Sequence, residues 1–354
     1  MPGEGMRVVV TGATGNVGTS VVAALAAEPG VAETVALARR VPPEPLPRSE
    51  FVSADVADAD LTEIFRGADA VVHLAWLIQP GRDESVTART NLLGSERVFR
   101  AVVDAGVSSL IYASSVGAYS PGPKDRLVDE SWPTAGIPSS FYSRHKAAVE
   151  RHLDLLESEQ PNLRVVRMRP GLIFKREAAT EIRRLFIGPL LPRWLLRSEL
   201  VPVSPAVDGL RSQAVHCDDV ADAYRRAVLG DVRGPFNLAA DPVIGAPELA
   251  QMLGARPVKV GGKALRAAAA ASYALRLQPA EPGWLDMALE VPLMSSERAR
   301  RELGWAPARS STEAIAELVR GMREAADAPT PPLAAGTSGP ARVREFVTGV
   351  GKRQ

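Results

Sequence analysis

Short apolar runs alternate with longer amphipathic segments through the first half of the chain. Apolar runs of roughly four to eight residues are typical of buried strands, and apolar residues spaced three or four apart are typical of helices. Strands are expected at 6–12, 34–38, 49–55, 68–76, 109–115 and 162–170. Helices are expected between them, at 17–30, 61–67, 91–106 and around 142. This alternation predicts an α/β fold whose doubly wound parallel sheet is covered by helices on both faces.

The pattern becomes irregular after Pro170. The proline-rich, apolar stretch 186–205 predicts a lid or cap, whereas 213–240 again indicates a strand, a helix and a strand that return to the sheet. Most of 246–323 has helical periodicity. The predicted division of the chain is a sheet domain at 1–170 joined by 213–240, a smaller, mostly helical C-terminal region at 171–212 and 241–326, and a disordered tail at 327–354 in which 342–350 can dock as a short helix.

The composition is that of an ordinary globular protein. Of 354 residues, 46% are hydrophobic and 23% are charged, and the formal net charge of +1 points to neither nucleic acid nor an acidic partner. The single cysteine, Cys217, excludes an intramolecular disulfide and fits a reducing compartment. No window approaches the roughly 20 apolar residues of a membrane span, and no signal-peptide pattern is present. We therefore expect a cytoplasmic protein with no nucleic-acid or membrane partner.

The first candidate site is the stretch "TGATGNVG" at 11–18, where the first expected strand turns into the first helix. Gly12, Gly15 and Gly18 are spaced three residues apart. A dinucleotide site needs one glycine for the tight turn, one for close approach of the pyrophosphate and one for close packing of helix on strand. Alone, the triplet indicates only a tight turn. Between a strand and a helix whose free N–H groups attract phosphate, it predicts a dinucleotide site.

The end of the second expected strand bears on the choice of dinucleotide. NAD-binding proteins usually carry an acidic residue about 20 residues past the glycine loop, where it holds the ribose 2′-hydroxyl. This chain has "ALARR", with Ala38 at the position of the acid and Arg39 and Arg40 after it. Arginine accommodates a 2′-phosphate, so the sequence favours NADP(H) over NAD(H). The alternative is an ordinary solvated basic pair.

A second candidate site is "FYSRHK" at 141–146. On a helix, Tyr142 and Lys146 lie on one face, so a phenol and an ammonium can meet. Such pairs are common on solvated helix faces, and this stretch alone does not establish a catalytic role.

In combination, the motifs give a specific picture. Over roughly residues 6–323, the chain resembles the NAD-dependent epimerase/dehydratase family of extended short-chain dehydrogenases/reductases, which have a Rossmann-type sheet. The resemblance rests on the order and spacing of "TGATGNVG", "ADV" (54–56), "VVHLA" (71–75), "NLLGSERV" (91–98), "YASSVGAY" (112–119), "YSRHK", "RPGLIF" (169–174), "VHCDDVADA" (215–223) and "RELGW" (301–305).

The resemblance implies roles for particular residues. Ser115, Tyr142 and Lys146 take the positions of the catalytic serine, tyrosine and lysine. Lys146 would hold the nicotinamide ribose and stabilise a phenolate whose unperturbed pKa is about 10. Residues expected to bind the cofactor are Gly12, Gly15, Asn16, Val17, Gly18, Arg39, Arg40, Asp55, Val56, Ala75, Tyr142 and Lys146. The sheet domain then binds the dinucleotide, and the C-terminal region forms the substrate-binding cap.

Other polar residues are interpreted as structural. Asn91 stands where the family often has a structural asparagine, and the alternative is a helix cap. His216 and Asp219 match a stretch that packs the domain together. The histidines show no metal-ligand spacing, and we expect no metal site.

The chain departs from the family's sugar-nucleotide enzymes at several positions. Val116 and Gly117 follow Ser115, where dehydratases carry an Asp-Glu pair. Leu172 stands where epimerases usually carry an asparagine, and Lys175–Arg176 where they carry Gly-Pro. Trp76 replaces a small residue, either narrowing the pocket or packing as a core aromatic.

These departures and the apolar stretch 186–205 favour an oxidoreductase that interconverts a secondary alcohol and a ketone on a fairly apolar small molecule. The alternatives are a sugar-nucleotide epimerase and a non-catalytic dinucleotide sensor. A homodimer is one assembly that the sequence allows.

Overall fold

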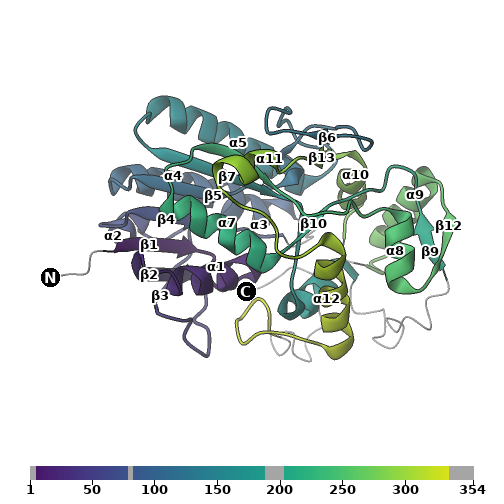
Figure 1. Cartoon of the computed structure of the whole chain (residues 1–354), viewed down its shortest axis with the longest axis horizontal. Helices are drawn as coiled ribbons and strands as arrows, with labels where there is room; N and C mark the ends of the chain where they lie inside the picture. The colour runs from purple at the N-terminus through teal and green to yellow at the C-terminus, as the bar shows by residue number, and fades with distance from the viewer. Residues whose placement is uncertain (1–4, 79–82, 188–202, 279, 335–354) are drawn as a thin grey trace.

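A seven-stranded parallel sheet forms the centre of the molecule (Figure 1). The computed structural model describes residues 5–78, 83–187, 203–278 and 280–334. The strand order is β11-β7-β5-β4-β1-β2-β3. These strands span Met6–Thr11 (β1), Val31–Ala38 (β2), Ser49–Ser53 (β3), Ala70–His73 (β4), Ser109–Ala113 (β5), Arg164–Pro170 (β7) and Gly234–Leu238 (β11). The expected strands and the α/β architecture are confirmed.

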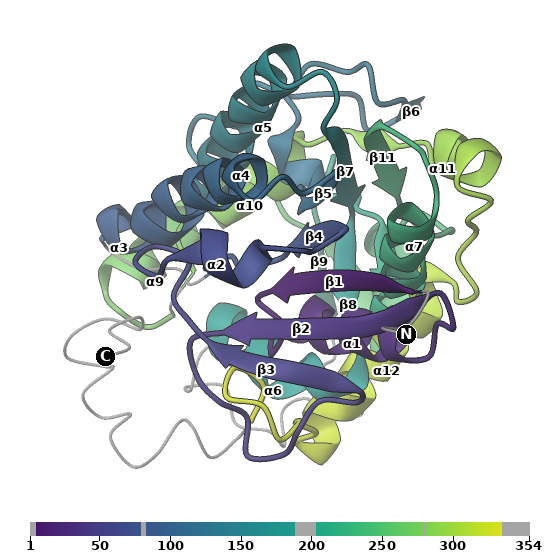
Figure 2. The same cartoon turned by 90° about the vertical axis from the view of Figure 1, so that its left-hand side faces the viewer.

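Helices cover both faces of the sheet, as Figure 2 shows. One face carries α1 (Asn16–Ala26) and α7 (Cys217–Leu229), and the other carries α2 (Leu61–Phe65), α4 (Ser95–Asp104) and α5 (Phe141–Glu159). The short helix α3 (Glu84–Ala88) continues through the π-helical segment Arg89–Gly94 into α4. Val8, Val9 and Val10 of β1 are completely buried because side chains on both faces of the strand meet a helix layer.

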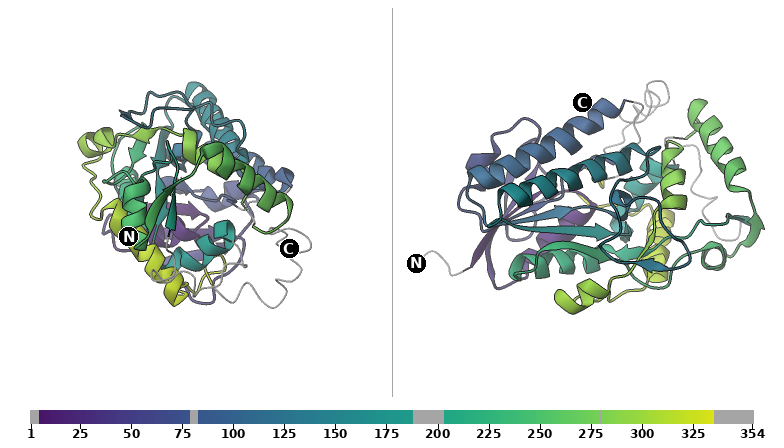
Figure 3. Two further views of the ribbon diagram at one scale, coloured as in Figure 1. Left: turned by 90° about the vertical axis from the view of Figure 1, so that its right-hand side faces the viewer. Right: turned by 90° about the horizontal axis from the view of Figure 1, so that it is seen from above.

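The C-terminal region is built from short strands and helices. Figure 1 and the right-hand view of Figure 3 place α8 and α9 beyond the carboxyl ends of the sheet strands. The helices are α6 (Ala179–Ile182), α8 (Ala246–Leu253), α9 (Gly262–Ala274), α10 (Gly283–Glu290), α11 (Glu297–Glu302) and α12 (Ser311–Glu324). Three two-stranded parallel pairs join β6 (Leu127–Val128) to β13 (Leu293–Met294), β8 (Leu172–Phe174) to β10 (Ala214–His216), and β9 (Val203–Ala206) to β12 (Arg256–Lys259).

The first part of the predicted tail, 327–334, packs onto the folded protein. Residues 327–334 were expected to begin a disordered tail, but Leu333 is completely buried and Arg184 donates a hydrogen bond to the Pro332 carbonyl at 3.1 Å. A buried leucine gives this Pro-rich segment the apolar anchor that composition alone does not reveal. The rest of the predicted tail, with 342–350, lies outside the described residues, as does 188–202 of the predicted lid.

No helix within the described ranges is long and apolar enough to cross a membrane.

The central strand β5 offers a test of the core. Replacing the completely buried Leu110 by alanine should lower the free energy of unfolding by about 2–5 kcal/mol, because the lost contacts leave a cavity. Leu275→Ala, at a side chain that is 70% exposed, is the matched control and should change it by no more than about 0.5 kcal/mol. Chemical denaturation of both variants makes the measurement. Equal effects would contradict this account of the core.

Candidate functional site

The glycine loop joins β1 to α1 where backbone segments approach very closely. Gly12 has a φ of 73°, and a Cβ there would lie 2.7 Å from the Ala75 backbone nitrogen. A Cβ on Gly18 would overlap the Gly12 carbonyl oxygen. Only glycine therefore lets α1 start directly against the end of β1 and beside the loop that follows β4.

The amino end of α1 is suited to an anion. Its N-cap, Gly15, supplies no side-chain hydrogen bond, and the first turn contains no acidic residue. The first N–H groups of a helix and its dipole attract phosphate. The Asn16 carbonyl accepts a hydrogen bond from Lys175 at 2.6 Å, and Val17 follows Asn16 in this first turn. This geometry fits a dinucleotide pyrophosphate.

Lys175, which follows β8 (Leu172–Phe174), reaches the first turn of α1, and sequence reasoning had named it only as a departure from the family. Its side chain is buried, and its ammonium also donates to Thr19 Oγ1 at 2.6 Å. A cation therefore lies against the first turn of α1, where it adds positive charge near the expected phosphate position. No local pattern signals this contact, because the two segments lie more than 150 residues apart in sequence.

The predicted adenosine-binding residues gather at the carboxyl ends of β2 and β3. Arg39 and Arg40 directly follow β2, and Asp55 and the buried Val56 follow β3. Asp55 accepts a hydrogen bond from the Ala57 N–H at 2.9 Å. Its other oxygen lies 3.9 Å from the Arg39 guanidinium, a side chain that is 45% exposed. These residues form one edge of the expected cofactor site.

Hydrogen bonds fix the backbone of the loop after β4 at the residues before and after Trp76. The Ala75 N–H donates to Thr11 Oγ1 at 3.3 Å. The Asn91 amide pairs with the Leu77 backbone in both directions, at 2.8 and 3.0 Å. Asn91 thus fixes the loop and caps no helix end.

His73 is a structural residue. It hydrogen-bonds Thr11 and Ser95, at 2.7 and 2.9 Å. Burial and the nearby Lys146 lower the pKa of His73 to about 3, so its imidazole is neutral at ordinary pH. Within the described residues, no group of three His, Cys, Asp or Glu side chains is placed to hold a metal ion.

The three predicted catalytic residues come together. Ser115 follows β5, and Tyr142 and Lys146 lie one turn apart at the start of α5, whose N-cap is Ser140. The Gly117 N–H donates to Ser115 Oγ at 3.0 Å, which orients the serine. Burial raises the pKa of Tyr142 to about 12, although its hydrogen bond with Ser115 acts in the opposite direction. The phenol therefore holds its proton throughout the neutral range.

Lys146 is buried beside the same strand. Its ammonium donates to the Ala113 carbonyl at 2.5 Å. Burial lowers the pKa of Lys146 well below its usual value, and the negative charge of Glu150 opposes that shift. Both ionisable groups of the pair are thus biased toward their neutral forms.

A buried ion network anchors α5, the helix that carries Tyr142 and Lys146. Glu150, one turn beyond Lys146, accepts hydrogen bonds from Arg169 at 2.8 and 2.9 Å, from Arg167 at 2.9 Å and from Ser114 at 2.5 Å. Burial alone would raise the pKa of the Glu150 carboxyl, but Arg169 and Arg167 outweigh it and lower the pKa to about 2. Sequence reasoning missed this network, because Arg167 and Arg169 lie 17 and 19 residues from Glu150 and no local pattern pairs them with it.

Aromatic and apolar side chains surround the phenol. The Tyr142 ring lies 5.0 Å from that of Trp284 on α10 and 6.0 Å from that of Trp76, centroid to centroid. Phe186 packs edge-on against Trp284. Gly117 makes room for the tyrosine, because a Cβ there would lie 2.9 Å from Tyr142 Cε1. The environment of the Tyr142 ring is therefore largely apolar.

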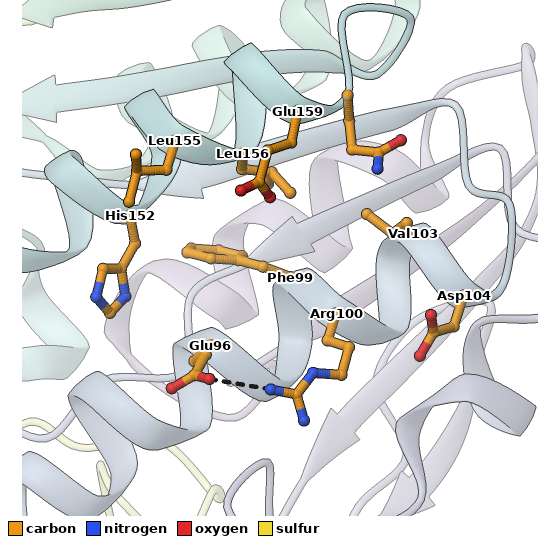
Figure 4. A pocket seen from close by; sticks show the side chains of 10 residues that line it. Glu96, Phe99, Arg100, Val103, Asp104, His152, Leu155, Leu156 and Glu159 are labelled. Atoms are coloured by element: carbon orange, nitrogen blue, oxygen red, sulfur yellow. Dashed lines mark hydrogen bonds and ion pairs between the residues drawn. The ribbon is translucent and has the colours of Figure 1, made fainter.

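A separate groove of about 440 Å³ lies between α4 and α5 (Figure 4). Phe99, Leu155 and Leu156 line it together with charged residues, among them the ion pair Glu96–Arg100. None of the predicted catalytic or cofactor-binding residues borders this groove. It is not part of the candidate site.

The chain is similar to known proteins in sequence and in fold. A family model described as "NAD dependent epimerase/dehydratase family" matches residues 8–239. An uncharacterised protein of Mycobacterium tuberculosis is 27% identical over 321 residues, which is 90% of this chain. The chain spans only 30% of the length of that relative.

Two further similarities cover nearly the whole of both proteins. A Stigmatella aurantiaca protein named 4-hydroxy-2-methyl-3-oxo-4-farnesyl-3,4-dihydroquinoline-1-oxide ketoreductase is 27% identical, over 85% of this chain and 92% of the relative. The solved structure of Thermus thermophilus UDP-glucose 4-epimerase with NAD has a TM-score of 0.66 and 23% identity, and covers 90% of this chain and 100% of that one. The latter similarity concerns the fold alone.

The close contact between Gly117 and Tyr142 can be tested without knowing a substrate. Gly117→Ala should lower the free energy of unfolding by about 1–3 kcal/mol, because the new methyl group overlaps the tyrosine ring. In Gly262→Ala, the methyl group meets Val207 at an ordinary 3.6 Å, and we expect no loss of stability. Thermal and chemical denaturation of both variants provide the comparison. A Gly117→Ala protein as stable as the wild type would refute the close packing.

Proposed function

The chain belongs to the NAD-dependent epimerase/dehydratase family, within the extended short-chain dehydrogenases/reductases, and we propose that it interconverts a secondary alcohol and a ketone with Tyr142 as acid/base. The observation that carries the proposal is the arrangement of Tyr142, which hydrogen-bonds Ser115 and lies one helical turn from Lys146. A nicotinamide dinucleotide, the cofactor expected for the family, supplies or accepts the hydride when bound.

The protonation state of Tyr142 suits ketone reduction. With a pKa of about 12, its phenol is protonated and can donate to the substrate carbonyl oxygen as that oxygen becomes negative. The Ser115 hydroxyl, oriented by Gly117, hydrogen-bonds the same oxygen and fixes its approach. Loss of the proton leaves a phenolate, which the Lys146 charge stabilises. In alcohol oxidation the same groups carry the proton the other way.

The surroundings of Tyr142 support an apolar carbonyl substrate over a nucleotide sugar. Val116 and Gly117 supply no acid/base pair for eliminating water. Lys175, which follows β8 where epimerases carry Gly-Pro, donates its hydrogen bonds to the first turn of α1. The indoles of Trp76 and Trp284 flank the phenol. The similarity to the Stigmatella aurantiaca ketoreductase points the same way. An epimerase, the alternative, would leave the cofactor's redox state unchanged overall, so net oxidation of NADPH by a panel of apolar ketones separates the two functions.

We expect the cofactor to be NADP(H) in preference to NAD(H). Arg39 is half-exposed at the carboxyl end of β2, and Arg40 follows it. Ala38 occupies the position at which an acidic side chain would bind a free 2′-hydroxyl. Guanidinium groups suit a 2′-phosphate because they present several N–H donors to its oxygens.

The role of Tyr142 is tested by removing one hydroxyl. Tyr142→Phe should lower turnover of a verified ketone by about 10²–10⁴-fold and leave cofactor affinity nearly unchanged, because the ring still packs. Ser115→Ala should lower turnover with cofactor affinity likewise unchanged. Tyr224→Phe, which removes a hydroxyl in the core on the α7 face, is the matched control and should retain turnover. Steady-state rates and cofactor titration provide the readouts. Near-wild-type turnover in Tyr142→Phe would exclude the proposed acid/base.

Cofactor preference is tested by reversing one charge. Arg39→Asp should bind NADH more tightly than NADPH, because the carboxylate repels a 2′-phosphate and accepts from a 2′-hydroxyl. Arg66→Asp, at an exposed residue whose ion pair is with Glu63, controls for the change in net charge and should keep the wild-type preference. Calorimetric titration of both cofactors measures the affinities. Equal wild-type affinities for the two cofactors would rule out the NADP(H) preference.

A further inference from the structure

The Lys146 ammonium is buried and forms no ion pair with any described residue, although the charge of Glu150 acts on it from farther away. Its side chain belongs to a residue that is 2% exposed, and its one hydrogen bond to the described residues goes to the Ala113 carbonyl. No carboxylate of the described residues lies within ion-pair distance of it. Three aromatic rings approach the nitrogen: Trp76, Tyr112 and Tyr142, with centroids at 3.4, 5.1 and 5.8 Å.

Trp76 is by far the nearest of these rings. At 3.4 Å from the centroid, the ammonium lies in van der Waals contact with the indole, where attraction between a cation and a π face is strongest. The same indole meets the Tyr142 ring nearly edge-on, at an interplanar angle of 79°. Trp76 therefore contacts both members of the tyrosine–lysine pair.

The backbone restrains Trp76 on both sides. Ala75, before it, donates to Thr11 and packs on Gly12. Leu77, after it, is paired twice with the buried amide of Asn91. The indole N–H has no hydrogen-bond partner among the described residues, so packing and the ammonium decide the orientation of the ring.

None of the other ionisable groups around Lys146 among the described residues is free to hold its ammonium by an ion pair. From its own helix, Glu150 faces it but is committed to Arg167 and Arg169, and Tyr142 is protonated. His145 on the same helix also interacts with it, and burial lowers the pKa of that imidazole. From β4 and β5, His73 and Tyr112 are buried and neutral at ordinary pH.

We propose that Trp76 is a positioning residue for Lys146, whose indole face holds the ammonium where it meets the cofactor ribose and favours its charged form. The inference rests on the proposed role of Lys146 in binding the cofactor. Removing the π face should leave the lysine less firmly placed and more easily deprotonated, because burial already disfavours its charge.

Cofactor binding tests the proposal without a substrate. Calorimetry should measure NADPH affinity from about pH 6 to pH 10, a range that approaches the ordinary pKa of lysine. The variants are Trp76→Leu, Trp76→Phe and Lys146→Met. Trp132→Leu is the matched control, because it removes an indole that faces Arg126 at 5.8 Å, outside the site.

Trp76→Leu should weaken NADPH binding roughly five- to thirtyfold, the range that corresponds to a cation–π contact of about 1–2 kcal/mol. Its affinity should also begin to fall at a lower pH than in the wild type, because the lysine loses its proton more readily. Trp76→Phe keeps a weaker π face, so its NADPH affinity and pH profile should lie between those of the wild type and Trp76→Leu. It carries the test if the leucine variant does not fold. Trp132→Leu should match the wild type in affinity and pH profile.

The other outcomes separate the two claims. If Lys146→Met weakens binding but the Trp76 variants match the wild type, or if their affinity falls off at a higher pH, the inference about Trp76 is wrong and the proposed function stands. If Lys146→Met binds NADPH as the wild type does, the proposed role of Lys146 is wrong and the inference fails with it.

Discussion

The geometry of the candidate site depends on a buried ion pair, in which the Glu150 carboxylate is held between Arg167 and Arg169. A buried charge must be paired and hydrogen-bonded, and breaking such a pair is costly. This pair links α5 to β7, and the bond from Ser114 extends the link to the end of β5. These bonds fix the position of α5, which carries Tyr142, relative to the end of β5, where Ser115 lies.

The sheet determines where a cofactor can lie relative to this helix. The strand order reverses between β1 and β4, and ligands of open parallel sheets bind outside the carboxyl ends at such a point. The glycine loop follows β1 there, and the loop that carries Trp76 follows β4. Close packing of Gly12 against Ala75 joins the two loops. A dinucleotide on α1 would therefore extend toward Tyr142 and Lys146.

Burial gives the tyrosine–lysine pair its chemical character. Burial raises the pKa of the phenol and lowers the pKa of the ammonium, so the pair starts from a protonated tyrosine and a lysine that depends on its surroundings for its charge. Aromatic rings contact the pair directly, and the charge of Glu150 acts on the ammonium without an ion pair among the described residues. This arrangement agrees with reduction of an apolar ketone, in which a neutral acid must give up a proton beside an apolar substrate.

The sequence alone determined the alternating elements, the glycine loop and the one-turn spacing of Tyr142 and Lys146, because each depends on residues close together in the chain. It also indicated Arg39 and Arg40 through their position after the second strand. Only the tertiary structure decided that Lys175 reaches the first turn of α1, that Gly117 makes room for Tyr142, and that Trp76 covers Lys146. It also placed Leu333 in the core, where composition had predicted disorder. These contacts join segments far apart in sequence, and local periodicity and motif spacing carry no information about which side chains packing brings together.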